Sequence, residues 1–141
     1  IHVQMASPDG TCRIMGAPFQ DIDIAVAAKR TIVSCETLVS DEAIRQHPEQ
    51  NSLTGLCVDA VVHMPYGAHP SQCFAHYDYD PAMLREYDQA SRTDGGFMSF
   101  LDAYVNRCPT HEAYLDYVGG ARLAALRVRP DFGYVPGLKR N

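Results

Sequence analysis

The sequence predicts an α/β fold: an open, partly parallel sheet flanked by helices, followed by a helical extension. Three observations carry this prediction. Short β-branched and apolar runs alternate with short amphipathic segments in the first part of the chain, as in sheets with helical crossovers. A Ser-Pro-Asp-Gly turn near the start indicates a hairpin, and therefore one antiparallel strand pair. After residue 80 the apolar residues recur at helical spacing.

The first segment, residues 1–80, is expected to contain four strands and two short helices. The expected strands are residues 1–5, 12–15, 31–39 and 56–64. The expected helices are residues 21–29 and 41–47. Ser40 is placed to cap the second helix, which ends before Pro48 because a residue that precedes proline avoids the helical region. The valine-rich run of the last strand is typical of a buried strand.

The second segment, residues 81–141, is expected to be a helical extension and tail of the same domain. The expected helices are residues 81–90, 96–106, 110–118 and 120–127, and residues 130–141 are expected to lie extended. Asp80 should cap the first of these helices, with proline at the first helical position. Phe97, Phe100 and Tyr104 share one helix face, which predicts a core or interface surface.

Composition limits the classes of partner. The chain has 141 residues, which fits one domain, and 17 acidic against 12 basic side chains give a net charge of −5 with no Lys/Arg run. Nucleic acid is therefore not an expected partner. No apolar run reaches the roughly 18 residues of a spanning helix, so no membrane segment is expected. Five widely spaced cysteines without a Cys-x-x-Cys pair indicate a reducing, cytoplasmic environment.

The most informative segment is the apolar run of residues 58–64 and the Pro-Tyr-Gly-Ala-His-Pro loop that follows it. Two prolines cannot donate to a sheet ladder, and glycine tolerates unusual backbone angles, so the strand delivers a stiff loop that carries Tyr66 and His69. Such loops often contribute to sites. The alternative is that both side chains hold the loop or pack against a partner subunit.

These residues resemble the A (alpha) subunit of family I CoA-transferases, in the glutaconate CoA-transferase-like branch. The resemblance covers nearly the whole chain and corresponds to the second half of that subunit. Its most specific pieces are Val-Asp-Ala-Val-Val at residues 58–62 and the loop at residues 65–70. Further pieces are residues 1–4, 9–10, 16–19, 27–29, 32–39, 77–80 and 91–94. The helical tail, which shorter oxoacid CoA-transferase subunits lack, favours the glutaconate-like branch.

The resemblance implies an enzyme that moves CoA between carboxylic acids. A glutamate that the beta subunit supplies attacks the acyl-CoA thioester and forms a glutamyl-CoA thioester, from which a second acid takes the CoA. Coenzyme A is then a co-substrate, and neither a permanently bound cofactor nor a metal is implied. The chain begins as a strand already under way, so the implied partners are acyl-CoA, the beta subunit, and the missing N-terminal half of the alpha subunit. This chain alone is not expected to be active.

The resemblance places the nucleophile outside this chain. The nearest look-alike is Glu36 in Cys-Glu-Thr-Leu, which lacks the glycine of the family's Glu-x-Gly turn, so a strand residue with structural contacts is the alternative to a nucleophile. The substrate-binding candidates are Phe19, Gln20, Tyr66 and His69. Tyr66 would contact an acyl group, and His69 would bind a carboxylate or act as acid or base near neutral pH. Gln20 would offer an amide to the substrate, and turn packing with a solvated amide is the alternative for Phe19 and Gln20.

Other interpretations stay open. Related alpha subunits belong to hydrolases that open a ring of a steroid-derived CoA thioester, and a non-catalytic assembly module is the third alternative. Five residues have side chains of the types that bind metals, but their spacing matches no compact metal-binding motif: His63, His69, Cys73, His76 and Asp78. Loop hydrogen bonding is the expected role of these residues. Cys73 is also a potential reactive thiol, although nothing in its surroundings indicates a lowered pKa. The residues considered for a CoA phosphate are Arg122, Arg127 and Arg129, for which a solvated helix face is the alternative.

Overall fold

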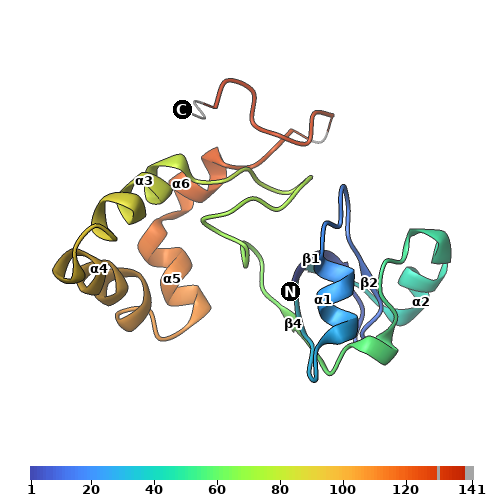
Figure 1. Ribbon diagram of the computed structural model, residues 1–141. Helices are drawn as coiled ribbons and strands as arrows, with labels where there is room; N and C mark the ends of the chain where they lie inside the picture. Colours follow the sequence, from blue (N-terminus) through green and yellow to red (C-terminus); the bar gives the residue numbers. More distant parts are fainter. Residues whose placement is uncertain (130, 139–141) are drawn as a thin grey trace. The chain divides into compact units, whose positions relative to one another are not determined.

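The computed structural model describes residues 1–129 and 131–138, and the chain divides into two compact units (Figure 1). The first unit comprises residues 1–68 and 73–76. The second comprises residues 69–72 and the chain from residue 77 onward. Residues 130–141 are expected to be extended, and positions 130 and 139–141 of this segment lie outside the described residues.

The first unit is built on a four-stranded sheet with the strand order β2-β1-β3-β4. Its strands are β1 (His2–Ala6), β2 (Cys12–Arg13), β3 (Ile32–Leu38) and β4 (Ala60–His63). β1 pairs antiparallel with β2 and parallel with β3, and β3 pairs parallel with β4. The predicted open, partly parallel sheet with one hairpin is confirmed.

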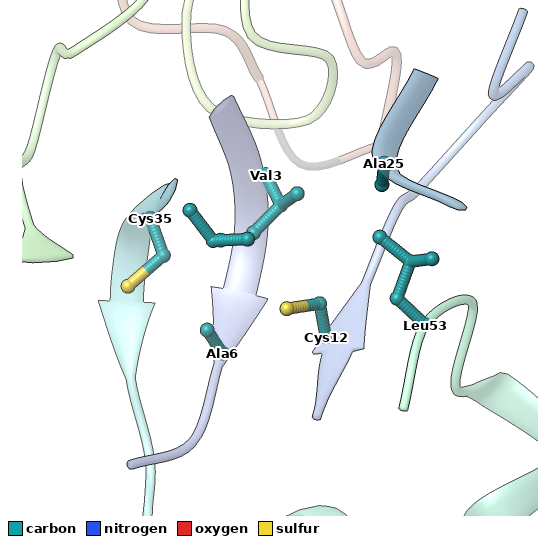
Figure 2. Close-up of a cluster of buried hydrophobic side chains, with 7 residues drawn as sticks. Val3, Ala6, Cys12, Ala25, Cys35 and Leu53 are labelled. Atoms are coloured by element: carbon teal, nitrogen blue, oxygen red, sulfur yellow. The ribbon is translucent and has the colours of Figure 1, made fainter. Parts of the chain in front are cut away.

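Helix α1 (Asp21–Ala27) lies between β2 and β3 in the chain and packs on one face of the sheet (Figure 1). The buried cluster under it consists of Val3, Ala6, Cys12, Ala25, Val33, Cys35 and Leu53. Figure 2 shows these side chains gathered between α1 and strands β1, β2 and β3. Helix α2 (Asp41–Arg45) begins after Ser40, whose hydroxyl accepts the Ala43 N–H at 3.2 Å, so the predicted cap is confirmed.

The buried strand expected at residues 56–64 is wrong in length and in burial. Residues Gly55–Cys57 form a short 3₁₀ turn, and only Ala60–His63 is a strand. Three of its four residues are exposed. In the sheet formed by the described residues, β4 is an edge strand that pairs with β3 only. Its valine-rich run is therefore apolar but largely exposed.

Between residues 81 and 125 the second unit consists of helices joined by short turns. These are α3 (Pro81–Ala90), α4 (Asp94–Leu101), a π-helical turn (Asp102–Asn106), α5 (His111–Val118) and α6 (Gly120–Ala125). The expected helix at residues 96–106 starts two residues earlier, because the Thr93 hydroxyl accepts the Gly96 N–H at 3.1 Å and so caps the helix. Gly119, with φ of 93°, separates α5 from α6.

An aromatic cluster joins α3, α4 and α5 within this unit. Ring centroids lie 5.4 Å apart for Tyr87 and Phe100, 4.6 Å for Phe100 and Tyr104, and 5.3 Å for Tyr104 and Tyr117. These are the separations of interacting aromatic pairs. Phe100 and Tyr104 of the predicted aromatic helix face thus pack against other rings, and Phe97, Phe100 and Tyr104 are all half-buried, so the core or interface role of this face stays a prediction. No helix among the described residues has the length and apolar character to cross a membrane.

Candidate functional site

The sheet of the first unit carries polar side chains on the face opposite α1. Side chains alternate along a strand, so His2 and Gln4 of β1 point away from the apolar core, as do Ser34 and Glu36 of β3. Gln4 is only 7% exposed and Glu36 only 9% exposed. Buried polar groups of this kind require hydrogen-bond partners, and those partners define the candidate site.

Glu36 is the centre of this network. Its Oε1 lies 2.6 Å from Nε2 of His2, and its Oε2 accepts the backbone N–H of Tyr66 at 2.9 Å. His2 is oriented in turn by a 2.8 Å contact between its Nδ1 and the Ser34 hydroxyl. A nucleophile must reach its substrate, whereas both oxygens of this buried carboxylate already have partners. The geometry therefore favours the structural interpretation of Glu36 over the nucleophilic one.

The loop of residues 64–68 rests on this polar face. Tyr66 is half-buried and has φ of 60°, a left-handed conformation that is uncommon for a residue with a side chain. The Gly67 N–H donates to the Met64 carbonyl at 2.9 Å, which closes a tight turn. A Cβ atom at Gly67 would lie 2.8 Å from the His2 ring, so the loop backbone approaches the imidazole as closely as glycine permits.

Cys73, in the segment of residues 73–76, lies close to this network. The ligand atoms of His2, Glu36 and Cys73 lie within 4.8 Å of one another. The 2.6 Å between His2 and Glu36 is a hydrogen-bond distance, shorter than the about 3.4 Å that separates two nitrogen or oxygen ligands on a tetrahedral zinc. Burial, assisted by the nearby Glu36 charge, raises the pKa of the Cys73 thiol to about 12, so this thiol is protonated at neutral pH. His2 and Glu36 are thus hydrogen-bonded to each other, and the protonated Cys73 thiol lies close to both.

The other residues of the ligand-type set are divided between the units. His63 and His76 belong to the first unit, and His69 and Asp78 to the second. His63 Nε2 lies 3.2 Å from the Glu36 carbonyl oxygen, a contact that links β4 to β3. Burial lowers the pKa of His76, with the Glu36 charge acting in the opposite direction. His2 is not recognisable as a site residue from the sequence, because a single histidine in an alternating strand gives no local signal of its partners.

Phe19 and Gln20 form the turn that precedes α1. The Phe19 side chain is 88% exposed and its backbone has φ of 43°. Gln20 occupies the N-cap position, but its side chain makes no capping hydrogen bond. Both residues are thus exposed on the first unit.

His69, by contrast, is enclosed within the second unit. Its side chain has no exposed area, its Nδ1 lies 2.6 Å from the Tyr114 hydroxyl, and its Nε2 lies 3.2 Å from Asp80. Burial lowers the pKa of His69 although the Asp80 carboxylate opposes this. A neutral ring that accepts from Tyr114 and donates to Asp80 uses both nitrogens. This geometry favours a structural role for His69 over direct substrate contact.

Asp80 ties several parts of the second unit together. Its Oδ1 accepts the N–H groups of Ala82 and Met83 at 3.0 Å each, so the predicted cap of α3 is confirmed. Its Oδ2 lies 2.5 Å from the Nε atom of Arg122 on α6. Burial alone would raise the pKa of Asp80, but the hydrogen bonds from Arg122 and Met83 outweigh it and lower the pKa.

The arginines considered for a CoA phosphate have other contacts. Arg122 pairs with Asp80, which the sequence argument did not anticipate. Arg129 pairs with Asp131 at 2.6 Å and lies 4.8 Å from the centre of the Phe132 ring. Arg127 forms an isolated antiparallel bridge with Tyr77. The two carboxylate pairs make Arg122 and Arg129 structural partners of acidic side chains.

No protein-family model matches the chain, but individual relatives do. The A subunit of glutaconate CoA-transferase from Acidaminococcus fermentans is 54% identical over 134 residues, which cover 95% of this chain and 42% of that protein. The crystal structure of glutaconate coenzyme A-transferase from the same organism matches 96% of the chain with a TM-score of 0.93 and 53% identity, over 43% of its own chain. This chain is a relative of the A subunit of glutaconate CoA-transferase. The predicted family resemblance is confirmed.

More distant relatives of this A-subunit-like chain have other named activities. The A subunit of 3-oxoadipate CoA-transferase from Pseudomonas knackmussii is 32% identical over 74% of the chain and 36% of that protein. The IpdA subunit of a cholesterol ring-cleaving hydrolase from Mycobacterium tuberculosis is 30% identical over 74% of the chain and 37% of that protein. The chain spans less than half the length of each of these three curated relatives.

Proposed function

We propose that the chain is part of a CoA-transferase alpha subunit, which moves CoA between carboxylic acids together with a beta subunit. The substrates would be glutaconate-like or other dicarboxylic acyl-CoA thioesters. The observation that carries the proposal is the 54% identity to a glutaconate CoA-transferase subunit over 95% of the chain. The 3-oxoadipate CoA-transferase and hydrolase relatives match at about 30% over shorter stretches, which favours the glutaconate-like substrate class.

In this proposal the chemistry takes place on a glutamate of the beta subunit. Its carboxylate attacks the acyl-CoA carbonyl and displaces the CoA thiolate, which leaves an anhydride between the acyl group and the glutamate. The thiolate then attacks the glutamyl carbonyl, which forms the enzyme-bound glutamyl-CoA thioester and releases the first acid as its carboxylate. A second carboxylate takes the CoA by the reverse sequence and regenerates the glutamate. Each addition develops an oxyanion, and one well-placed hydrogen-bond donor contributes a factor of about 10²–10³ to such a step. The two hydrogen-bond partners of the buried Glu36 carboxylate support a structural role for this residue and a nucleophile outside this chain.

Residues of this chain would contact the substrate and shape its pocket. Phe19 and Gln20 are suited to this by their exposure, and Tyr66 by its place on a tight, half-buried loop. His69 would act indirectly, by holding the segment around it in place, since both of its ring nitrogens already have partners.

The proposal includes the rest of the assembly. The partners are the beta subunit together with the remaining, N-terminal part of the alpha subunit, and coenzyme A is a co-substrate with no permanently bound cofactor. The relatives named as A subunits support a hetero-oligomer. The five cysteines are all free thiols, in keeping with the cytoplasm. Residues 1–80 would be the second half of the α/β domain, and residues 81–141 its helical extension and tail.

A ring-opening hydrolase is the alternative, supported by the 30% identity to the IpdA subunit. In the transferase reaction the beta subunit supplies a glutamate, whereas the hydrolase would lack this residue. The sequence of the partner at the nucleophile position therefore separates the two. A non-catalytic assembly module is the remaining possibility, for which neither activity would be found.

Borohydride trapping tests the proposal directly. The complete complex is incubated with an acyl-CoA and borohydride, which reduces an enzyme-bound glutamyl thioester, and intact and peptide masses locate the mark. A mark on the partner chain is expected, and the Glu36→Gln complex should carry it at the same position. A mark on Glu36 would contradict the assignment of the nucleophile. Turnover of a cyclic acyl-CoA without any mark would indicate the hydrolase. The absence of both a mark and turnover would indicate the assembly module.

A further inference from the structure

We infer that Glu36 is a positioning residue: its buried carboxylate, oriented by His2, fixes the backbone of Tyr66 and thereby the loop of residues 64–68 that meets the acyl-CoA substrate. The role in catalysis rests on the proposed CoA-transferase activity. The structural part, one carboxylate that controls the conformation of one loop, does not depend on that activity and can be measured separately.

The strand register brings the three groups together. β1 and β3 run parallel with His2 opposite Ser34, so the next outward-pointing side chain of β3, Glu36, lies beside the same imidazole. One carboxylate oxygen contacts His2 at 2.6 Å and the other accepts the Tyr66 N–H at 2.9 Å. The buried side chain of a sheet residue therefore holds a backbone group of the loop directly, with no other residue between them.

Tyr66 needs such support because of its backbone conformation. A φ of 60° places its backbone in the left-handed region, which costs a residue with a side chain about 1–2 kcal/mol and persists only when the surroundings impose it. Hydrogen bonds to ionised acceptors are about twice as strong as neutral ones, and they are stronger still in a buried site. The bond from the Tyr66 N–H to Glu36 is placed to stabilise this conformation.

His2 fixes the other side of the arrangement. The Ser34 hydroxyl contacts Nδ1 at 2.8 Å, which leaves Nε2 directed at Glu36 and determines the orientation of the ring. The same ring lies under Gly67, where an added Cβ would approach it to 2.8 Å. The imidazole thus orients the carboxylate and limits how far the loop can sink toward the sheet.

This role predicts a chemical difference between two substitutions. A nucleophile requires an ionised carboxylate, so both Glu36→Gln and Glu36→Ala would abolish its function. A positioning residue requires an oxygen acceptor at the correct distance, which glutamine retains and alanine lacks. Glutamine can also donate from its amide nitrogen to Nε2 of His2, because the Nδ1–H tautomer of His2 can donate to the Ser34 hydroxyl.

Amide hydrogen exchange in the complete complex measures the structural part. We expect the peptide that contains Tyr66 to exchange about 10- to 100-fold faster in Glu36→Ala, since a hydrogen bond to a charged group is lost, and near the wild-type rate in Glu36→Gln. Asp59→Ala is the matched control. Its carboxylate, in the same unit, accepts the Thr31 N–H at 2.8 Å and pairs with Arg30, so its loss should leave the Tyr66 peptide unchanged.

Steady-state kinetics of the same complexes measure the catalytic part. Glu36→Ala should raise the KM for acyl-CoA about tenfold, whereas Glu36→Gln should restore most of the loss. Unchanged exchange in Glu36→Ala would overturn the inference, as would a Glu36→Gln complex that has lost turnover while its loop exchanges normally. If Glu36→Ala fails to assemble, Glu36→Asp, which keeps the charge and shortens the side chain, should show the faster exchange.

A wild-type complex without CoA transfer would overturn only the proposed function, and the exchange result would still decide the role of Glu36 in the loop.

Discussion

Asp80 and His69 form a buried pair in which the carboxylate Oδ2 lies 3.2 Å from the imidazole Nε2. The same Oδ2 contacts Arg122, and Oδ1 caps helix α3. A single carboxylate that is 2% exposed thus links the segment before α3 to α6. Since a buried charge is costly unless it is paired, this cluster is expected to control the stability of the second unit.

The first prediction concerns acid sensitivity. Burial lowers the pKa of His69 below its ordinary 6.5, so the unfolded chain binds the proton first as the pH falls. The stability contributed by the neutral ring is complete above about pH 6.5 and is lost as the pH decreases through the folded pKa. The free energy of unfolding of the complete protein, measured at fixed concentration from pH 8 to pH 5, should therefore decrease on the acid side.

A substitution isolates the contribution of His69 to this slope. One group changes stability by at most about 1.4 kcal/mol per pH unit, and His69→Gln should reduce the slope by part of this amount. His76, whose pKa is also lowered by burial, contributes in the same direction, so some slope should remain. His47→Gln, at an exposed position, is the control. An equal slope in wild type and His69→Gln would refute the assignment.

The second prediction compares a buried and an exposed ion pair. Asp80→Ala removes the α3 cap and leaves Arg122 without its carboxylate, which should lower the free energy of unfolding by about 3 kcal/mol. Asp88→Ala breaks an exposed pair with Arg92, at 2.7 Å, and should cost about 0.5 kcal/mol or less. Denaturant unfolding of both variants checks this. If Asp80→Ala and Asp88→Ala lowered the free energy of unfolding by similar amounts, the burial of Asp80 would not contribute to stability.

The sequence predicted the local part of this cluster but not its long-range part. Asp80 followed by proline indicated a helix start, because capping depends on adjacent residues. That the same carboxylate also holds His69 and Arg122, 11 and 42 positions away, depends on how the helices pack. The same holds for Glu36. Its partner His2 is 34 residues away, and the local Cys-Glu-Thr-Leu pattern showed only that the glycine of the nucleophile motif is absent.

The error at β4 has a different physical origin. A valine-rich run predicts a strand well, because β-branched side chains suit an extended backbone. Its burial depends on which neighbours cover it, and among the described residues β4 has a pairing partner on one side only. The α/β class and the partly parallel sheet followed from alternating elements, whereas the polar network on the far face of the sheet required the register of β1 and β3.

A third prediction concerns the cysteines. Burial raises the pKa of Cys12 to about 12 and that of Cys73 to about 12, and it also raises the pKa of Cys35. Since only the thiolate reacts, these three should alkylate slowly in the folded protein. Cys57 and Cys108 are partly exposed and should be labelled first. Iodoacetamide labelling followed by peptide mass analysis, before and after addition of urea, checks the order; early modification of Cys73 would contradict its enclosed position.

The last prediction compares two glycines in equivalent substitutions. A Cβ atom at Gly67 would lie 2.8 Å from both the His2 ring and the Met64 carbonyl oxygen, and the carbonyl cannot move without shifting the turn. Gly67→Ala should therefore destabilise by about 1–3 kcal/mol and speed exchange at the Tyr66 amide, because displacement of His2 disturbs Glu36. Gly95 in α4 has nothing within 4 Å of an added Cβ, so Gly95→Ala should be neutral or up to about 1 kcal/mol stabilising. Unfolding and hydrogen exchange of both variants decide the matter: if Gly67→Ala unfolds and exchanges like Gly95→Ala, the loop does not rest on His2.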